Sequence, residues 1–239
     1  MKELSRLHSS SAILAALLLA LCVACSSVAQ AKVTGADIYE KTVKSTPLYA
    51  DPELEAYIKT LGEEIVAVSE MAGKKFTFTL LDDEALNAFA TRDNYIYVNR
   101  GLLNYVSNEA QLVSVLAHEV GHVTRGHVTG QEERMTGAKI LSTLAAVLSN
   151  SNEVYEATMA YANSMIQSHG RRNELEADET GAEYMAKLGY DPTEMLSMLS
   201  IMKDNESAQK KRAKGQGVSK PTYHGVFSSH PRNDARLRT

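Results

Sequence analysis

The residue types best suited to chemistry stand together at positions 118–122, which read His118-Glu119-Val120-Gly121-His122, an H-E-x-x-H motif. In an α-helix, side chains four positions apart lie on the same face, so both imidazoles can reach one metal ion from a single rigid element. Glu119 then points to the side of that metal, where it can take a proton from a bound water molecule. The motif therefore predicts a hydrolytic metal site, with Zn²⁺ as its metal.

A catalytic zinc needs a third protein ligand, and the sequence offers two ways to supply it. A third histidine on the same segment requires Gly at 125 and His at 128. These positions hold Arg125 and Val128, and His127 is one residue out of register, which disfavours this arrangement. The other source is a later, acid-rich and helix-compatible segment, in which Glu174 and Asp178 are four apart. Glu174 can bind the metal there while Asp178 accepts the free N–H of a zinc-bound histidine.

The elements that position these residues follow from periodicity and capping. Apolar residues recur at helical spacing after Asn108, a plausible N-cap, so the motif lies on a helix with one buried face. Asp51 followed by Pro52 begins an earlier helix. Short strands are predicted over residues 76–81, 87–91 and 95–99, and helices over 136–148, 154–169, around Glu174 to near 189, and from 191 onward. We therefore expect an α+β, predominantly helical fold with a small three- to four-stranded sheet.

Two stretches are predicted to lie outside the folded core. Residues 207–222 are rich in Ser, Lys, Gly and Gln and read as a mobile basic loop, with a flap over the cleft as the alternative. Residues 1–31 combine a basic start, an apolar run and an A-x-A site ending at Ala31, which indicates a cleaved signal peptide and a periplasmic protein. A lipoprotein signal acylated at Cys25 is the alternative and would anchor the protein to the outer membrane. Residues 32–239 then form a single domain.

Composition narrows the chemistry. Both cysteines, Cys22 and Cys25, lie in the predicted signal segment, so a mature chain beginning at residue 32 has no thiol ligand and must hold zinc with His and carboxylate groups. A formal net charge of −4 with no basic stripe gives no case for a nucleic-acid partner. No later run of residues is apolar enough to predict a membrane span.

The motifs together resemble a known family. H-E-x-x-H followed by R-x-x-E-x-E-A-D at 171–178 is similar to the gluzincin metallopeptidases of the HtpX and CAAX-prenyl-protease type. Residues 87–91 resemble that family's edge strand, residues 95–103 resemble the hairpin strand after it, and Ser229-His230-Pro231 with Arg236 resembles its S/T-H-P-x-x-x-x-R segment. With neither membrane helices nor repeats, the chain is most similar to the short periplasmic, LoiP-like branch. It departs from the family at Asp93-Asn94, where a Gly-rich turn is usual, and at His169-Gly170.

The resemblance implies a role for each matching residue. It makes Glu119 the general base and Asp178 the group that orients a ligand. It makes His230 a stabiliser of the oxyanion, with an autoinhibitory zinc ligand or a loop residue before Pro231 without a chemical role as the alternatives. It implies one Zn²⁺ per chain, held by His118, His122 and Glu174. It also implies a substrate-binding edge strand made of Asn87, Ala88, Phe89 and Ala90.

The expected function is that of a zinc-dependent endopeptidase that hydrolyses unfolded or misassembled proteins in the cell envelope. Its partners are then unfolded or flexible protein segments, which pair with the edge strand through backbone groups. The alternative is a zinc-stabilised, latent or non-catalytic chaperone or binding module of the envelope.

Overall fold

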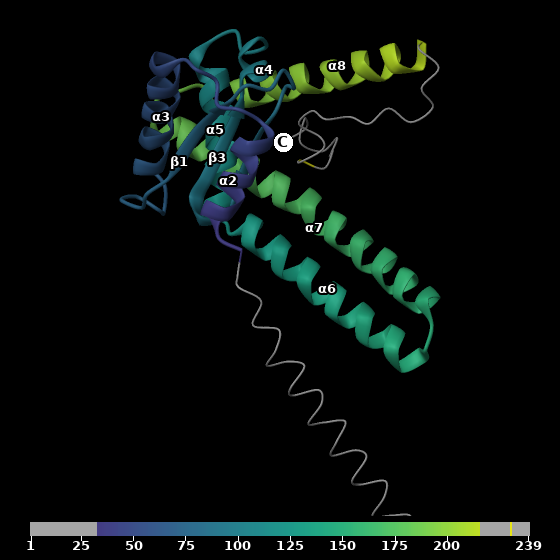
Figure 1. The fold of residues 1–239 in the computed structure, drawn as a ribbon. Helices are drawn as coiled ribbons and strands as arrows, with labels where there is room; N and C mark the ends of the chain where they lie inside the picture. The colour runs from purple at the N-terminus through teal and green to yellow at the C-terminus, as the bar shows by residue number, and fades with distance from the viewer. Residues whose placement is uncertain (1–32, 216–229, 231–239) are drawn as a thin grey trace, which may run out of the picture. The chain divides into compact units, whose positions relative to one another are not determined.

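The computed structural model describes residues 33–215 and residue 230, except for the side chains of residues 167–169, 213 and 214. These residues form a mostly helical structure around one small sheet (Figure 1), which confirms the predicted α+β class. All the elements belong to one unit, residues 35–239. In chain order they are α2 (Gly35–Ser45), α3 (Pro52–Ala67), β1 (Thr77–Leu81), β2 (Ala88–Thr91), the 3₁₀ turn η1 (Arg92–Asn94), β3 (Tyr95–Asn99), α4 (Arg100–Leu103), α5 (Glu109–Thr124), α6 (His127–Ser149), α7 (Asn152–Lys187) and α8 (Glu194–Gly215).

The sheet has the order β1-β3-β2, with β1 parallel and β2 antiparallel to β3. The turn η1 joins β2 to β3, and its residues Asp93 and Asn94 have φ angles of 59° and 65°. Asp and Asn tolerate this left-handed region better than other non-glycine residues. Asp93 and Asn94 can therefore form the turn at the place where the gluzincin family that the chain resembles usually has glycines. The three predicted strands are present, and β2 lies at the edge of the sheet.

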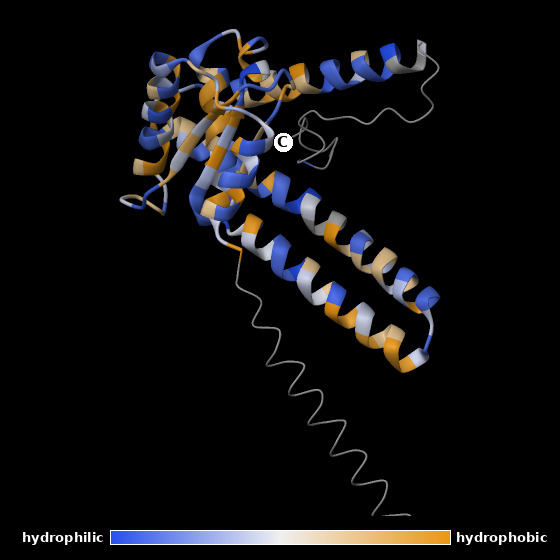
Figure 2. Ribbon diagram, viewed as in Figure 1, coloured by the Kyte–Doolittle hydropathy of each residue, from blue (hydrophilic) through white to orange (hydrophobic). Residues whose placement is uncertain are grey.

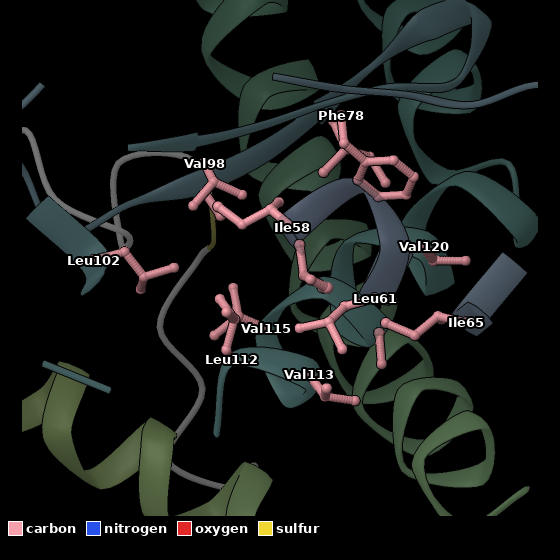
Figure 3. Packing of buried hydrophobic residues seen from close by; sticks show 14 of the residues in the cluster. Ile58, Leu61, Ile65, Phe78, Val98, Leu102, Leu112, Val113, Val115 and Val120 are labelled. Atoms are coloured by element: carbon pink, nitrogen blue, oxygen red, sulfur yellow. The ribbon is translucent and has the colours of Figure 1, made fainter. Parts of the chain in front are cut away.

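The hydrophobic core lies between α3, the sheet and α5. Figure 3 shows Ile58, Leu61 and Ile65 of α3 among apolar side chains from the sheet and from α5. The predicted start of α3 is confirmed, because the Asp51 side chain accepts a hydrogen bond of 3.0 Å from the Leu54 amide and Pro52 begins the helix. A rigid core therefore supports α5 from the face opposite α7.

The predicted helices between residues 136 and 189 are longer than expected. Helix α6 begins at His127, and the segments predicted as two separate helices form the single helix α7 of 36 residues. A lone glycine inside a helix costs about 1 kcal/mol. Packing of α7 against α6 along their length (Figure 1) offsets that cost at Gly170. The outer end of α6 is apolar (Figure 2), with Val147 71% and Leu148 78% exposed.

The predicted loop over 207–222 is wrong for residues 207–215, which continue α8 as far as Gly215. The stretch is rich in Ala, Gln, Lys and Arg, which are good helix formers, so its polarity marks a solvated helix and not a loop. Residues 216–222 and the predicted signal segment 1–31 lie outside the described residues. Among the described helices, none is long and apolar enough to cross a membrane.

Candidate metal centre

Helix α5 carries the H-E-x-x-H motif as predicted. The Asn108 side chain caps the helix by accepting a hydrogen bond of 2.8 Å from the Gln111 amide. Its three motif side chains are buried, and the Nε2 atoms of His118 and His122 lie 3.0 Å apart. Both imidazoles thus direct the same ring nitrogen toward one point.

Helix α7 crosses α5 at two glycines, one on each helix. A Cβ atom on Gly121 would lie 3.0 Å from the carbonyl oxygen of Ala177, and a Cβ atom on Gly181 would lie 3.0 Å from the backbone nitrogen of His118. Only glycine allows such a close approach of two backbones. The contact brings the carboxylates of α7 over the histidines of α5.

Glu174 and His230 complete a cluster of four donors. The Glu174 carboxylate oxygens lie 3.4 Å from His118 Nε2 and 3.3 Å from His122 Nε2. His230 Nδ1 lies 3.4 Å from His118 Nε2 and 3.2 Å from Glu174. All four residues are buried, and one donor atom from each falls within 4.8 Å of the others. The three predicted ligands therefore meet at one point, together with His230, whose role the sequence left open.

The spacing of these donors fits a small metal ion. Bonds of 2.0–2.2 Å in a tetrahedron place neighbouring ligand atoms about 3.3–3.6 Å apart, and the five contacts between donors given above are 3.0–3.4 Å long. Glu119 gives a second indication. It is 2% exposed, and its Oε2 atom has no hydrogen-bond partner among the described residues. A buried oxygen of this kind requires a partner inside the site.

Electrostatics favour a cation at the same point. Burial on its own raises the pKa of Glu119. The nearby His230, His118 and His122 have the larger combined effect and lower this pKa to about 2. The pKa of Glu174 lies well below its usual value, because the same imidazoles outweigh its burial. Burial lowers the pKa of His122 to about 4. The two buried carboxylates are therefore ionised and call for positive charge, whereas His122 is neutral and free to act as a ligand.

His230 interacts with both carboxylates. Its Nε2 atom lies 3.2 Å from Glu119 Oε1, and its Nδ1 atom lies 3.2 Å from Glu174. Burial lowers the pKa of His230, but these two carboxylates raise it well above its usual value. The imidazole therefore lies directly between the predicted base and the predicted third ligand.

The ring nitrogens that face away from the cluster also have partners. His118 Nδ1 lies 2.8 Å from Asp178 Oδ1, as predicted for a residue that orients a ligand. The contact of His122 was missed by sequence reasoning. Its Nδ1 atom lies 3.1 Å from His127 Nδ1, and His127 Nε2 lies 3.2 Å from Glu176 Oε2. A third histidine five positions after His122 was the available signal, but it is out of register for a metal ligand and its spacing alone assigns it no chemistry.

The predicted edge residues, Asn87 to Ala90, lie in and just before β2, which contacts α5. Ala88 to Ala90 pair with β3, and Asn87 accepts a backbone hydrogen bond of 3.0 Å from Asn99.

A second feature, a pocket, adjoins the site on the side of α8. Here a pocket bounded by His118, Glu119 and His230 has an apolar wall made of Met195, Met198, Leu199 and Met202. These methionines are buried and also belong to the hydrophobic core.

Comparison with known proteins places this arrangement among metallopeptidases. The family model described as Peptidase family M48 matches residues 52–239. The chain is 32% identical to the beta-barrel assembly-enhancing protease of Yersinia pestis over 211 residues, which are 84% of this chain and 41% of that protein. It is 30% identical to the protein of the same name from Escherichia coli K12, with the same coverage. It is also 31% identical over 132 residues to the mitochondrial metalloendopeptidase OMA1 of Arabidopsis thaliana, covering 53% of this chain and 25% of that protein. The chain thus spans less than half the length of these relatives.

Proposed function

The chain belongs to peptidase family M48, and from this premise we propose that it is a zinc-dependent endopeptidase that cleaves unfolded or misassembled proteins of the cell envelope. The observation that carries the proposal is the buried cluster of His118, His122 and Glu174 with Glu119 beside it. The relatives' names add two elements, proteolysis and the assembly of β-barrel proteins. The site fits the first, and the second suggests the class of substrate.

The roles of the residues follow from their places. Two imidazoles and one carboxylate are a ligand set typical of catalytic zinc, and no cysteine lies near the cluster among the described residues. Once bound, the metal would polarise the scissile carbonyl and make a water molecule more acidic. Glu119, ionised and buried, would accept the proton of the attacking water and deliver it to the leaving amine. Asp178 would hold His118 with its Nδ1–H outward and its Nε2 lone pair toward the metal.

The position of His230 supports an autoinhibitory role over the stabilisation of an oxyanion. Its Nδ1 atom lies 3.2–3.4 Å from atoms of two of the other ligands, a spacing that suits a fourth ligand of the same metal. Catalytic zinc keeps that vertex open for water and substrate, whereas a site closed by four protein groups is inactive. We therefore assign the described arrangement to a latent state, from which His230 must withdraw before a peptide is cleaved.

Strand β2 supports the choice of substrate. An edge strand offers backbone N–H and C=O groups to any extended chain, and recognition through backbone groups is largely independent of sequence. Because β2 contacts α5, a peptide paired with Asn87–Ala90 would run beside the helix that carries Glu119. Folded proteins do not offer such extended segments, so unfolded chains would be preferred.

The test is cleavage of unfolded casein by the purified protein, with and without a zinc chelator. Glu119→Gln should bind one zinc per chain and lose activity about 10²–10⁴-fold, since the amide cannot accept the proton. Glu179→Gln makes the same chemical change at an exposed position of α7 and is the matched control. Unchanged cleavage by Glu119→Gln would refute the general base. Stoichiometric zinc without any cleavage, even after His230→Ala, would favour the chaperone or binding module instead.

A further inference from the structure

Two residues outside the ligand set lie behind His122. His127 is the first residue of α6, is 7% exposed, and has both ring nitrogens in contact with other groups. Its Nδ1 atom faces His122 Nδ1 at 3.1 Å, and its Nε2 atom faces Glu176 Oε2 at 3.2 Å. The three groups therefore form a chain that starts at a candidate ligand and ends at a carboxylate.

The direction of these hydrogen bonds follows from the chemistry of imidazole. A histidine that offers the Nε2 lone pair to a metal carries its proton on Nδ1. His122 Nδ1–H must then donate to an acceptor, and the only atom that His127 presents to it is Nδ1. His127 accepts there only as the tautomer with its proton on Nε2, and that N–H is aimed at the Glu176 carboxylate. One assignment of protons satisfies every contact.

We propose that His127, held by Glu176, is a positioning residue that fixes the tautomer and ring orientation of His122 for metal binding. This inference rests on the proposed function, because it takes His122 as a ligand. Glu176 provides the terminal negative charge that selects the Nε2–H tautomer of His127. Without this chain, His122 could carry its proton on Nε2, where it would block the metal.

The backbone between α5 and α6 places His127 for this contact. Helix α5 ends at Thr124, and Gly126 has φ 68°, in the left-handed region that glycine adopts without strain. The chain turns at this glycine and α6 begins at the next residue, which places His127 against His122. Arg125, in the same turn, lies 4.0 Å from Glu176 Oε1 and donates a hydrogen bond of 2.9 Å to Thr180. The turn therefore anchors the carboxylate end of the chain as well as the imidazole.

The two histidine ligands are supported unequally. His118 contacts Asp178 directly at 2.8 Å, whereas His122 reaches a carboxylate only through another imidazole. A neutral acceptor polarises an N–H less than a carboxylate does. His122 is thus the ligand whose orientation depends on a single uncharged contact, and the loss of that contact should be measurable.

The experiment compares zinc affinity among full-length variants by competition with a chromogenic chelator at constant pH. His127→Leu removes the acceptor and should weaken zinc binding about 10–100-fold. His127→Asn places a carbonyl oxygen near the position of Nδ1 and should restore most of the affinity. Glu176→Leu should weaken binding less, and Glu179→Leu, the same change at an exposed position of α7, should have no effect. The visible spectrum of the Co²⁺-loaded protein should change in His127→Leu and return in His127→Asn.

The outcomes separate this inference from the proposed function. If the wild type binds no zinc, or if His122→Ala binds it unchanged, both fail. If His122→Ala loses zinc while His127→Leu keeps wild-type affinity and cobalt spectrum, only the positioning role is overturned. The melting temperatures of the metal-free variants show whether His127 only packs against its neighbours, because a packing role would lower the stability of the fold without metal as well. Equal zinc losses in His127→Leu and His127→Asn, with the same drop in melting temperature, would also overturn the inference.

Discussion

Replacing Gly181 by alanine should weaken metal binding and lower the melting temperature, although the new methyl group lies outside the ligand set. The Cβ atom would lie 3.0 Å from the backbone nitrogen of His118 and 3.1 Å from the carbonyl carbon of Ala117. Comfortable contacts between such atoms are about 3.5–4.0 Å. The Met195 Cε atom, 2.8 Å away, can shift, but the other two partners belong to the backbone of α5, so the strain is relieved only if α7 moves away by a few tenths of an ångström.

Two magnitudes follow from this displacement. Overpacking of this kind costs about 1–3 kcal/mol, which lowers the melting temperature of a domain of this size by about 2–4 °C for each kcal/mol. Glu174 lies two helical turns from Gly181 on the same rigid helix and moves with it. Its distances of 3.3–3.4 Å from the two histidine nitrogens then lengthen by the same few tenths of an ångström, which distorts a zinc tetrahedron. We expect zinc affinity to fall about tenfold or more.

The assay measures the zinc dissociation constant and the melting temperature with and without zinc. Gly137→Ala is the matched control, because Gly137 lies inside α6 and a Cβ atom there meets nothing within 4 Å. That change should stabilise the protein by about 0.5–1 kcal/mol through helix propensity and leave zinc affinity unchanged. If Gly181→Ala behaves like Gly137→Ala in both measurements, the close approach of α5 and α7 does not set the ligand geometry.

Three further predictions concern other parts of the chain. His230→Ala should raise kcat/KM for casein while zinc stays bound, because it opens the fourth vertex; a fall in kcat/KM would indicate a stabiliser of the oxyanion. The Tyr184 hydroxyl donates a hydrogen bond that holds the pKa of Glu70 below its ordinary 4.5. That contact stabilises the fold above about pH 4.5 and is lost as pH falls through the lowered pKa, so Tyr184→Phe should reduce the melting temperature at pH 7 and progressively less below pH 4. Asp51→Ala removes the cap of α3 and should cost about 0.5–2 kcal/mol in a urea titration, whereas equal stability would show that the cap contributes nothing.

Local signals predicted the parts of this protein that depend on local physics. The spacing of His118 and His122 needs only a helix, and the capping residues Asn108 and Asp51 begin helices where expected. The four-residue spacing of Glu174 and Asp178 likewise put both on one face of α7. The contact of this face with α5 is a tertiary contact. In the sequence it was indicated only by the resemblance to a known family.

The residues that sequence reasoning missed depend on contacts between elements. His127 was weighed by its register as a metal ligand, but the turn at Gly126 gives it a different contact, behind His122. Composition suggested a loop from residue 207, yet α8 continues to Gly215. Helix propensity decided that segment, because a solvated helix and a loop share the same polar residues.

The place of His230 has a consequence for how such an enzyme responds to its substrate. His230 and His118 are 112 positions apart but belong to one polypeptide, so if His230 closes the site as proposed, its imidazole would be a tethered competitor of the substrate. A tether of this kind gives an effective concentration on the order of millimolar. Such a competitor raises the apparent KM by a constant factor, because only the fraction of molecules with an open site can bind a peptide. Cleavage would therefore stay slow while unfolded chains are scarce and would rise in proportion to their concentration.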